Sequence, residues 1–182
     1  FRRVLFRSQA VATRLFERLG GRGTVAVIEA SADAPTSVDR ARGFRAAAAR
    51  FPGIRLVACG YGAYQYEAAR AAMRDLLAHT RTLDGVLAAN DVMALGALDA
   101  LEEAGRRAVV VGVNAIPDAV TAIRQGRLLA SADYSALNLG ALAVECAIRR
   151  LRGEAVPAVI LLLVEIVDRD NCAGWEKPYE ER

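Results

Sequence analysis

The chain has 182 residues, of which 54% are hydrophobic and 25% are charged, and its formal net charge at pH 7 is +3. This length suits an α/β domain, and no run of 18 or more apolar residues is present that could span a membrane. The positive charge comes from scattered arginines, with Lys177 as the only lysine, and the absence of a basic stripe with interleaved aromatic residues argues against a nucleic-acid surface.

The first eight residues, FRRVLFRS, resemble the in-frame translation of a sequencing-library adapter. They show no start methionine, no signal-peptide pattern and no capped element. We therefore interpret residues 1–8 as an adapter-derived artefact and predict no element there. On this interpretation the genuine protein begins near Gln9 and lacks an upstream part that could have held a signal peptide.

From residue 9 onward, helical and strand patterns alternate along the chain. Apolar residues at helical spacing, closed by glycine or proline, predict helices at residues 9–19, 37–50, 64–79, 93–104, 117–125 and 136–151. Short apolar or β-branched runs predict strands at residues 24–29, 54–58, 86–89, 108–111, 129–132 and 158–167. Repeated strand–helix units predict an α/β fold with a doubly wound parallel sheet and right-handed crossovers.

Two asparagines stand directly after predicted strands. Asn90 follows the strand at 86–89, and Asn114 follows the strand at 108–111. Asp91 is expected to cap the helix that begins there. Because ligands bind at the carboxyl ends of the strands in open parallel sheets, both asparagines are predicted to lie at a binding cleft.

Several longer motifs resemble one family. They are DRARGF at residues 39–44, AANDVMALGALDALEEAG, VVVGVNAIPDAVTAIRQGRLLASAD and LRGEAVP. In this order they are similar to the type I periplasmic sugar-binding proteins of ABC transporters, the ribose-binding-like group, over about residues 9–171. The resemblance implies two α/β lobes that clamp a sugar, with three crossings of the chain between them.

The resemblance also implies domain boundaries. Residues 24–131 would form the second lobe, nearly complete. Residues 9–23 would be a remnant helix of the first lobe, residues 132–171 would be a further remnant with a helix and a strand, and residues 172–182 would be a tail. Most of the first lobe would be missing.

Sugar hydroxyls both donate and accept hydrogen bonds, so a sugar site needs fixed arginine, asparagine and aspartate side chains and an aromatic face for the ring. The resemblance assigns these ligand contacts to Arg40, Tyr64, Asn90, Asn114, Asp133 and Tyr134.

Structural alternatives stand beside these assignments. Arg40 could be a solvated helix-end arginine, and Asn90 could bond its own backbone in a turn. Tyr64 could be an exposed residue at a helix start, with two other tyrosines near enough to replace it, and residues 133–134 could form a hinge or cap. Many family members carry aspartate at the position of Asn114, so pentose, hexose, polyol and furanosyl ligands all stay open.

The function that follows is solute binding for an ABC transporter, with a sugar as ligand and a membrane permease as partner, and without nucleic acid. The implied location is the periplasm, or a lipid-anchored extracellular position in a one-membrane bacterium. The alternative is the ligand-sensing domain of a lactose-repressor-type transcription regulator, which shares the lobes. The segment AIRQGRLLASAD is typical of the transport proteins.

Enzyme signatures are absent from the sequence. It contains no GxSxG, no phosphate-binding glycine loop and no nucleophile beside a base, and its single histidine, His79, lies at a polar helix end. The three cysteines are widely spaced and predict neither a disulfide framework nor a metal site. We therefore predict no catalysis, no metal and no cofactor.

Overall fold

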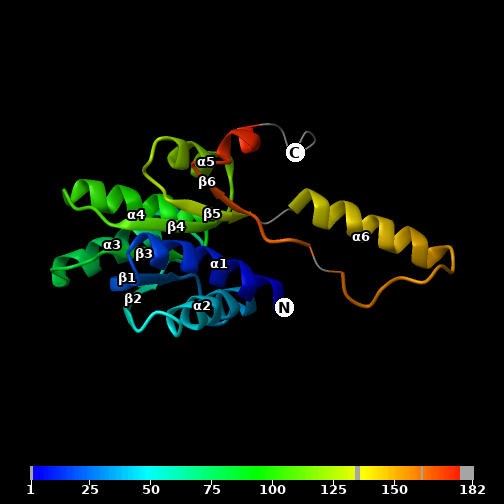
Figure 1. The fold of residues 1–182 in the computed structure, drawn as a ribbon, viewed down its shortest axis with the longest axis horizontal. Coiled ribbons are helices and arrows are strands. Elements are labelled where there is room, and N and C mark those ends of the chain that lie inside the picture. The colour runs from blue at the N-terminus through cyan, green and yellow to red at the C-terminus, as the bar shows by residue number, and fades with distance from the viewer. Residues whose placement is uncertain (1, 134–135, 161, 177–182) are drawn as a thin grey trace.

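The computed structural model describes residues 2–133, 136–160 and 162–176, which form a six-stranded sheet with helices on both faces (Figure 1). The helices are α1 Arg2–Arg18, α2 Pro35–Ala48, α3 Tyr66–His79, α4 Asp91–Glu103, α5 Pro117–Arg124, α6 Ala136–Leu151 and the 3-10 helix η1 Cys172–Glu176. The strands are β1 Arg22–Glu29, β2 Gly53–Tyr61, β3 Gly85–Ala88, β4 Val109–Asn114, β5 Ala130–Asp133 and β6 Ile166–Asp168. Within the described residues, no helix is both long and apolar enough to cross a membrane.

The strand order across the sheet is β2-β1-β3-β4-β5-β6. Strands β1 to β5 are parallel, and β6 is antiparallel to β5. The chain moves from β1 to β2 on one side and then returns past β1 to β3, so the strand order reverses between β1 and β3. The predicted doubly wound parallel sheet is therefore confirmed.

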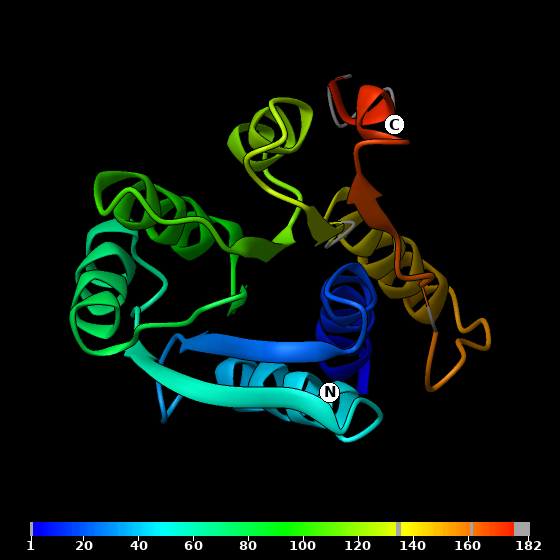
Figure 2. The same cartoon turned by 60° about the vertical axis from the view of Figure 1, so that its left-hand side comes forward.

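Two apolar layers cover the sheet because successive strand side chains point to opposite faces. On β1, Val25 and Val27 pack with α1 and α2, whereas Ala26 and Ile28 pack with α3 and α4. Figure 2 shows α1 and α2 grouped together, apart from α3 and α4. Strands β1, β3 and β4 therefore contribute to both cores, which explains why their sequences read as nearly continuous apolar runs.

Helix α1 differs from two expectations. It begins at Arg2, so residues 2–8, for which no element was predicted, are helical. It also packs against α2 and the sheet instead of standing apart as a remnant of another lobe. The apolar face of α1 that contacts them is fully buried and consists of Val11, Ala12, Leu15 and Phe16. The helical spacing showed that this face needs a partner, but the spacing carries no information on which sheet supplies it.

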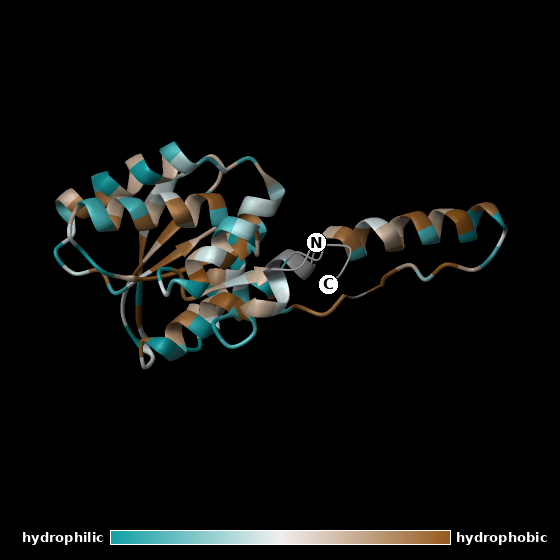
Figure 3. Cartoon of the chain, turned by 90° about the horizontal axis from the view of Figure 1, so that it is seen from above, coloured by the Kyte–Doolittle hydropathy of each residue, from teal (hydrophilic) through white to brown (hydrophobic). Residues whose placement is uncertain are grey.

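Helix α6 projects away from the sheet (Figure 1), and none of its residues is buried. Figure 3 shows apolar residues along α6, where they face solvent. The chain then returns toward the sheet, and β6 and η1 pack against β5 and α5. Of the expected tail at residues 172–182, the part up to residue 176 therefore belongs to the folded unit.

The strand predicted at residues 158–167 is shorter than expected. Only β6, Ile166–Asp168, forms ladder hydrogen bonds, and it does so with β5. A strand needs a neighbour for its backbone N–H and C=O groups. Glu165 contributes one further bond, because its backbone oxygen accepts from the Asp133 N–H at 2.8 Å. Residues 158–160 and 162–164 pair with no strand among the described residues, so their apolar sequence alone does not produce a strand.

Candidate ligand-binding site

The carboxyl ends of β3, β4 and β5 place polar residues along one edge of the sheet. Asn90 lies two residues beyond the end of β3, Asn114 ends β4, and Asp133 ends β5. Asn114 and Asp133 are paired in the register of these two strands, so they lie side by side. Asn90 and Asp133 are 6% and 9% exposed, respectively, so both residues are almost entirely buried at this edge.

Arg40 reaches this edge from α2. The residue is buried, and its guanidinium donates to the backbone oxygen of Ala89 and, over 3.3 Å, to Oδ1 of Asn114. A guanidinium has only donors, so the amide of Asn114 must turn its oxygen toward Arg40. The NH₂ group of Asn114 is therefore the group available to another partner. The solvated helix-end alternative for Arg40 does not fit its burial.

Tyr64 completes this cluster from the loop before α3. The guanidinium carbon of Arg40 lies 5.8 Å from the centre of the Tyr64 ring, and the Tyr64 hydroxyl is 2.8 Å from Oγ1 of Thr36. A cation at this distance from an aromatic face is attracted to it. Tyr61 is 57% exposed, and the hydroxyl of Tyr66 is bonded to a carboxylate of α4. Tyr64 is thus the tyrosine of the three that contacts Arg40.

Backbone conformation sets the two loops of this cluster apart. Among the described residues, left-handed φ values at non-glycine positions occur at Ala63 (49°), Tyr64 (59°), Asn114 (127°) and Ala115 (52°). Such values are unfavourable for residues with a Cβ atom and persist only where neighbouring contacts hold them. Strained backbone of this kind clusters at ligand sites, and here it lies in the loops that carry Tyr64 and Asn114.

The start of α4 differs from the prediction. Asn90, and not Asp91, is the N-cap, because its backbone is extended (φ −149°) and its Oδ1 accepts from the backbone N–H of Met93 at 2.9 Å. Asp91 already has a helical position in the first turn and is fully buried. The capping bond uses the amide oxygen of Asn90, so its NH₂ group is the donor that it can offer to a ligand.

Asp91 instead holds neighbouring strands together. Its Oδ2 accepts from the backbone N–H of Ile116 at 2.9 Å, and its Oδ1 accepts from the hydroxyl of Ser131 at 2.6 Å. Burial raises the pKa of Asp91 to about 6, although the bonds to Ser131 and Ile116 and the charge of Arg40 act in the opposite direction. Sequence reasoning missed this role and that of Ser131. A charged residue directly after a buried strand was the available signal.

Because the pKa of Asp91 is raised, we predict that the difference in unfolding free energy between the wild type and Asp91→Asn changes with pH. Between about pH 4 and pH 6 the unfolded chain has lost the proton that the folded chain keeps, so raising the pH through this window lowers the unfolding free energy of the wild type. The shift from 3.8 to about 6 corresponds to about 3 kcal/mol.

The variant has no such titration, so we expect the unfolding free energy of the wild type minus that of Asp91→Asn to fall by up to about 3 kcal/mol over this window. Urea denaturation at a series of pH values measures the difference. A difference that is constant from pH 4 to pH 7 would contradict the raised pKa.

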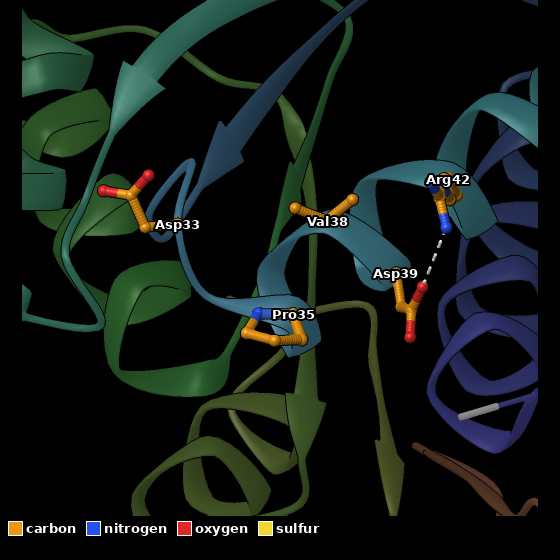
Figure 4. Close-up of a pocket in the computed structure, with 5 residues that line it drawn as sticks. All are labelled: Asp33, Pro35, Val38, Asp39 and Arg42. Carbon is orange, nitrogen blue, oxygen red and sulfur yellow. Dashed lines mark hydrogen bonds and ion pairs between the residues drawn. The ribbon is translucent and has the colours of Figure 1, made fainter.

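Other features of the surface do not join this cluster. A depression of about 380 Å³ lies at the start of α2 (Figure 4) and is lined by Asp33, Pro35, Val38, Asp39 and Arg42. It shares no lining residue with the edge described above. Tyr134 lies outside the described residues. No group of three or more His, Cys, Asp or Glu side chains within the described part of the chain is placed to hold a metal ion.

A parallel sheet whose carboxyl edge carries converging arginine, asparagine and tyrosine side chains is typical of the lobes of α/β proteins that bind small molecules. The family model described as "Periplasmic binding protein domain" matches residues 8–155. The chain belongs to this family.

Similar proteins agree with this assignment. The chain is 31% identical over 159 residues to a xylitol-binding protein of Mycolicibacterium smegmatis, a match that covers 85% of the chain and 45% of that protein. It is 42% identical over 87 residues to the ribose import binding protein RbsB of Escherichia coli, a match that covers 47% of the chain and 29% of RbsB. The chain therefore spans less than half the length of these curated relatives.

Among solved structures, an ABC transporter periplasmic solute binding protein from Actinobacillus succinogenes with bound D-allose superposes with a TM-score of 0.90. It is 28% identical, and the match covers 93% of this chain and 60% of that one. A solute binding protein from Bacillus halodurans with bound myo-inositol has a TM-score of 0.84 and 26% identity, with 95% and 59% covered.

Proposed function

We propose that the chain forms one lobe of the solute-binding component of an ABC transporter and that this component captures a sugar or sugar-like molecule. The observation that carries the proposal is the contact network of Arg40 with Asn114 and Tyr64 at the carboxyl edge of the sheet. Arginine and amide groups provide fixed partners for sugar hydroxyls, and the ring provides a face for the apolar side of a sugar. The sugars and polyols in the names of the similar proteins support the same ligand class.

Five residues at this edge are assigned to the ligand in the proposal: Arg40, Tyr64, Asn90, Asn114 and Asp133. The NH₂ groups of Asn90 and Asn114 act as donors, because the oxygen of each amide already accepts a bond within the lobe. Asp133 supplies a carboxylate acceptor beside Asn114. Together these groups offer both donors and acceptors, which is what a polyhydroxylated ligand requires.

A second lobe is part of the proposal. We assign residues 2–133 and 166–176 to the lobe described here, which moves α1 into it, and residues 136–165 to the other lobe. The apolar residues of α6 support this division, because they lie uncovered among the described residues. The solved relatives are longer than this chain and are consistent with a further lobe.

A permease partner and a periplasmic location, or a lipid-anchored extracellular one, follow from the transport function, and no catalysis is expected. The relatives and solved structures named above are described as binding or import proteins, which supports transport over the regulator alternative. Isothermal calorimetry of a two-lobed protein that contains this chain would test the proposal with D-ribose, D-allose, xylitol and myo-inositol. Failure of a wide sugar panel to bind, or turnover of a bound sugar, would refute it.

Asn114→Asp is predicted to change the ranking of ligands more than the stability of the fold. The carboxylate would pair with Arg40 and would present acceptors in place of the NH₂ donor, without a change in core volume. Affinities of wild type and variant for the same sugar panel provide the measurement. An unchanged ranking would remove Asn114 from the site, and Asp118→Asn on the following helix α5 serves as a control for a single aspartate–asparagine exchange.

A further inference from the structure

The turn after β4 is held by hydrogen bonds that lead, directly or through a hydroxyl, to one buried carboxylate. Asp91 has no exposed area, and its two oxygens accept from the Ile116 N–H at 2.9 Å and the Ser131 hydroxyl at 2.6 Å. The Ser131 oxygen in turn accepts from the Ala115 N–H at 2.9 Å. Asp91, directly or through Ser131, therefore holds the two consecutive backbone N–H groups that follow Asn114.

These bonds hold a segment whose backbone conformation is unfavourable. Asn114 and Ala115 both have left-handed φ values, 127° and 52°, that their Cβ atoms disfavour. A non-glycine residue stays in this region only if surrounding contacts over-determine its conformation. The bonds at Ala115 and Ile116 supply such contacts on the side of the turn that faces the sheet.

The surrounding residues leave space for this carboxylate. A Cβ atom on Gly112 of β4 would lie 2.1 Å from Oδ1 of Asp91, so only glycine permits the carboxylate to approach the strand here. Asp91 also lies in the first turn of α4, where the positive end of the helix dipole favours a carboxylate. The placement of Asp91 thus depends on a strand, a helix and Ser131 of β5 at once.

We propose that Asp91 is a positioning residue, which fixes the turn after β4 and thereby sets the direction in which Asn114 presents its amide group to the ligand. The inference rests on the proposed function, in which Asn114 meets the sugar. Arg40 holds the amide oxygen of Asn114 from one side, and Asp91 holds the backbone from the other. Ligand selectivity at this edge therefore depends on a residue that does not touch the ligand.

A first experiment needs no ligand. Amide hydrogen exchange at Ala115 and Ile116, and the NMR resonances of the Asn114 side-chain NH₂, are measured in wild type, Asp91→Asn and Ser131→Ala. We expect exchange at these amides to accelerate about tenfold or more and the Asn114 resonances to shift, because a buried charged acceptor is lost or its bridging hydroxyl is removed.

Asp99→Asn is the matched control, since Asp99 is on the same helix and also accepts hydrogen bonds, from Tyr66 and Arg127, away from the edge. Asp99→Asn should leave the exchange rates of the Ala115 and Ile116 amides unchanged. If Asp91→Asn does not fold, Ser131→Ala decides, because it keeps the carboxylate and removes the hydroxyl that links Asp91 to Ala115. Unchanged exchange at both amides in the folded variants would overturn the proposal.

A second experiment tests the link to the ligand with D-ribose and D-allose as probes in the two-lobed protein. If Asp91 acts through Asn114, Asp91→Asn should weaken binding about tenfold in the wild-type background and have little further effect in the Asn114→Ala background. Additive losses would overturn the positioning role. Absence of sugar binding by the wild type would refute the proposed function, while the exchange result would stand independently of it.

Discussion

Replacing Arg40 by alanine is expected to weaken sugar binding roughly 10- to 100-fold, because hydrogen bonds from a charged group contribute ~1.5–3 kcal/mol each. Arg40 is buried and lies between Ala89, Asn114 and the Tyr64 ring, so its loss removes both a ligand donor and the partner that orients the Asn114 amide. Calorimetry of the two-lobed protein with the sugar panel gives the affinities.

Arg42→Ala is the matched control. Arg42 lies on the same helix, is 66% exposed at its side chain and pairs only with Asp39 at 3.4 Å among the described contacts, so its replacement should leave affinity unchanged. Arg40→Lys should restore little of the binding, because an ammonium group cannot reproduce the planar fork of a guanidinium. Circular dichroism separates loss of binding from loss of fold, and an Arg40→Ala protein that is folded and binds normally would exclude Arg40 from the site.

The 182-residue chain by itself is expected to associate in solution through α6. Leu137, Val144, Ile148 and Leu151 are 46%, 60%, 43% and 88% exposed, and their spacing places them on one face of this helix. An apolar stripe without a partner favours association, since contact with a second copy removes it from water. Size-exclusion chromatography should therefore show a species larger than the 19.5 kDa monomer.

The double substitution Val144→Lys with Ile148→Lys should shift the chain toward the monomer. Glu145→Lys is a matched control, because it changes the net charge by the same amount at an exposed residue beside the stripe. Hydrogen exchange should be fast along α6 in the double variant and slow in β3, β4 and the part of α1 from Val11 to Phe16, which contribute buried residues to the core. A wild-type monomer with a protected α6 would show that the stripe is covered within one chain.

Local pattern was sufficient to predict much of the fold. The strands at β3 and β4 are short apolar runs with a switch to helical spacing after them, so the sequence predicted both their type and the position of Asn90 and Asn114 at their carboxyl ends. Arg40 and Tyr64 came from the family resemblance, and only the structure brings them into contact with each other. Their separation along the chain made that contact invisible to any local pattern.

Three features depended on tertiary structure. Asn90 and Asp91 are both good capping residues, and the choice between them follows from the space that Gly112 leaves for a buried Asp91 carboxylate. The apolar face of α1 required a cover, but only packing identified the sheet that provides it. Residues 158–165 have the composition of a strand. In this part of the chain, however, the strand found is β6, Ile166–Asp168, which pairs with β5.

The sequence by itself therefore determined the alternation of helices and strands, the polar residues at the strand ends and, through its motifs, the family. Spacing along the chain encodes these features directly, because helix and strand periodicities are local properties. Tertiary structure decided the hydrogen-bond partners at the edge of the sheet, the burial of Asp91 and the packing of α1 against α2 and the sheet. Each of these depends on which residues, far apart in the sequence, lie next to one another in space. No local pattern carries that information.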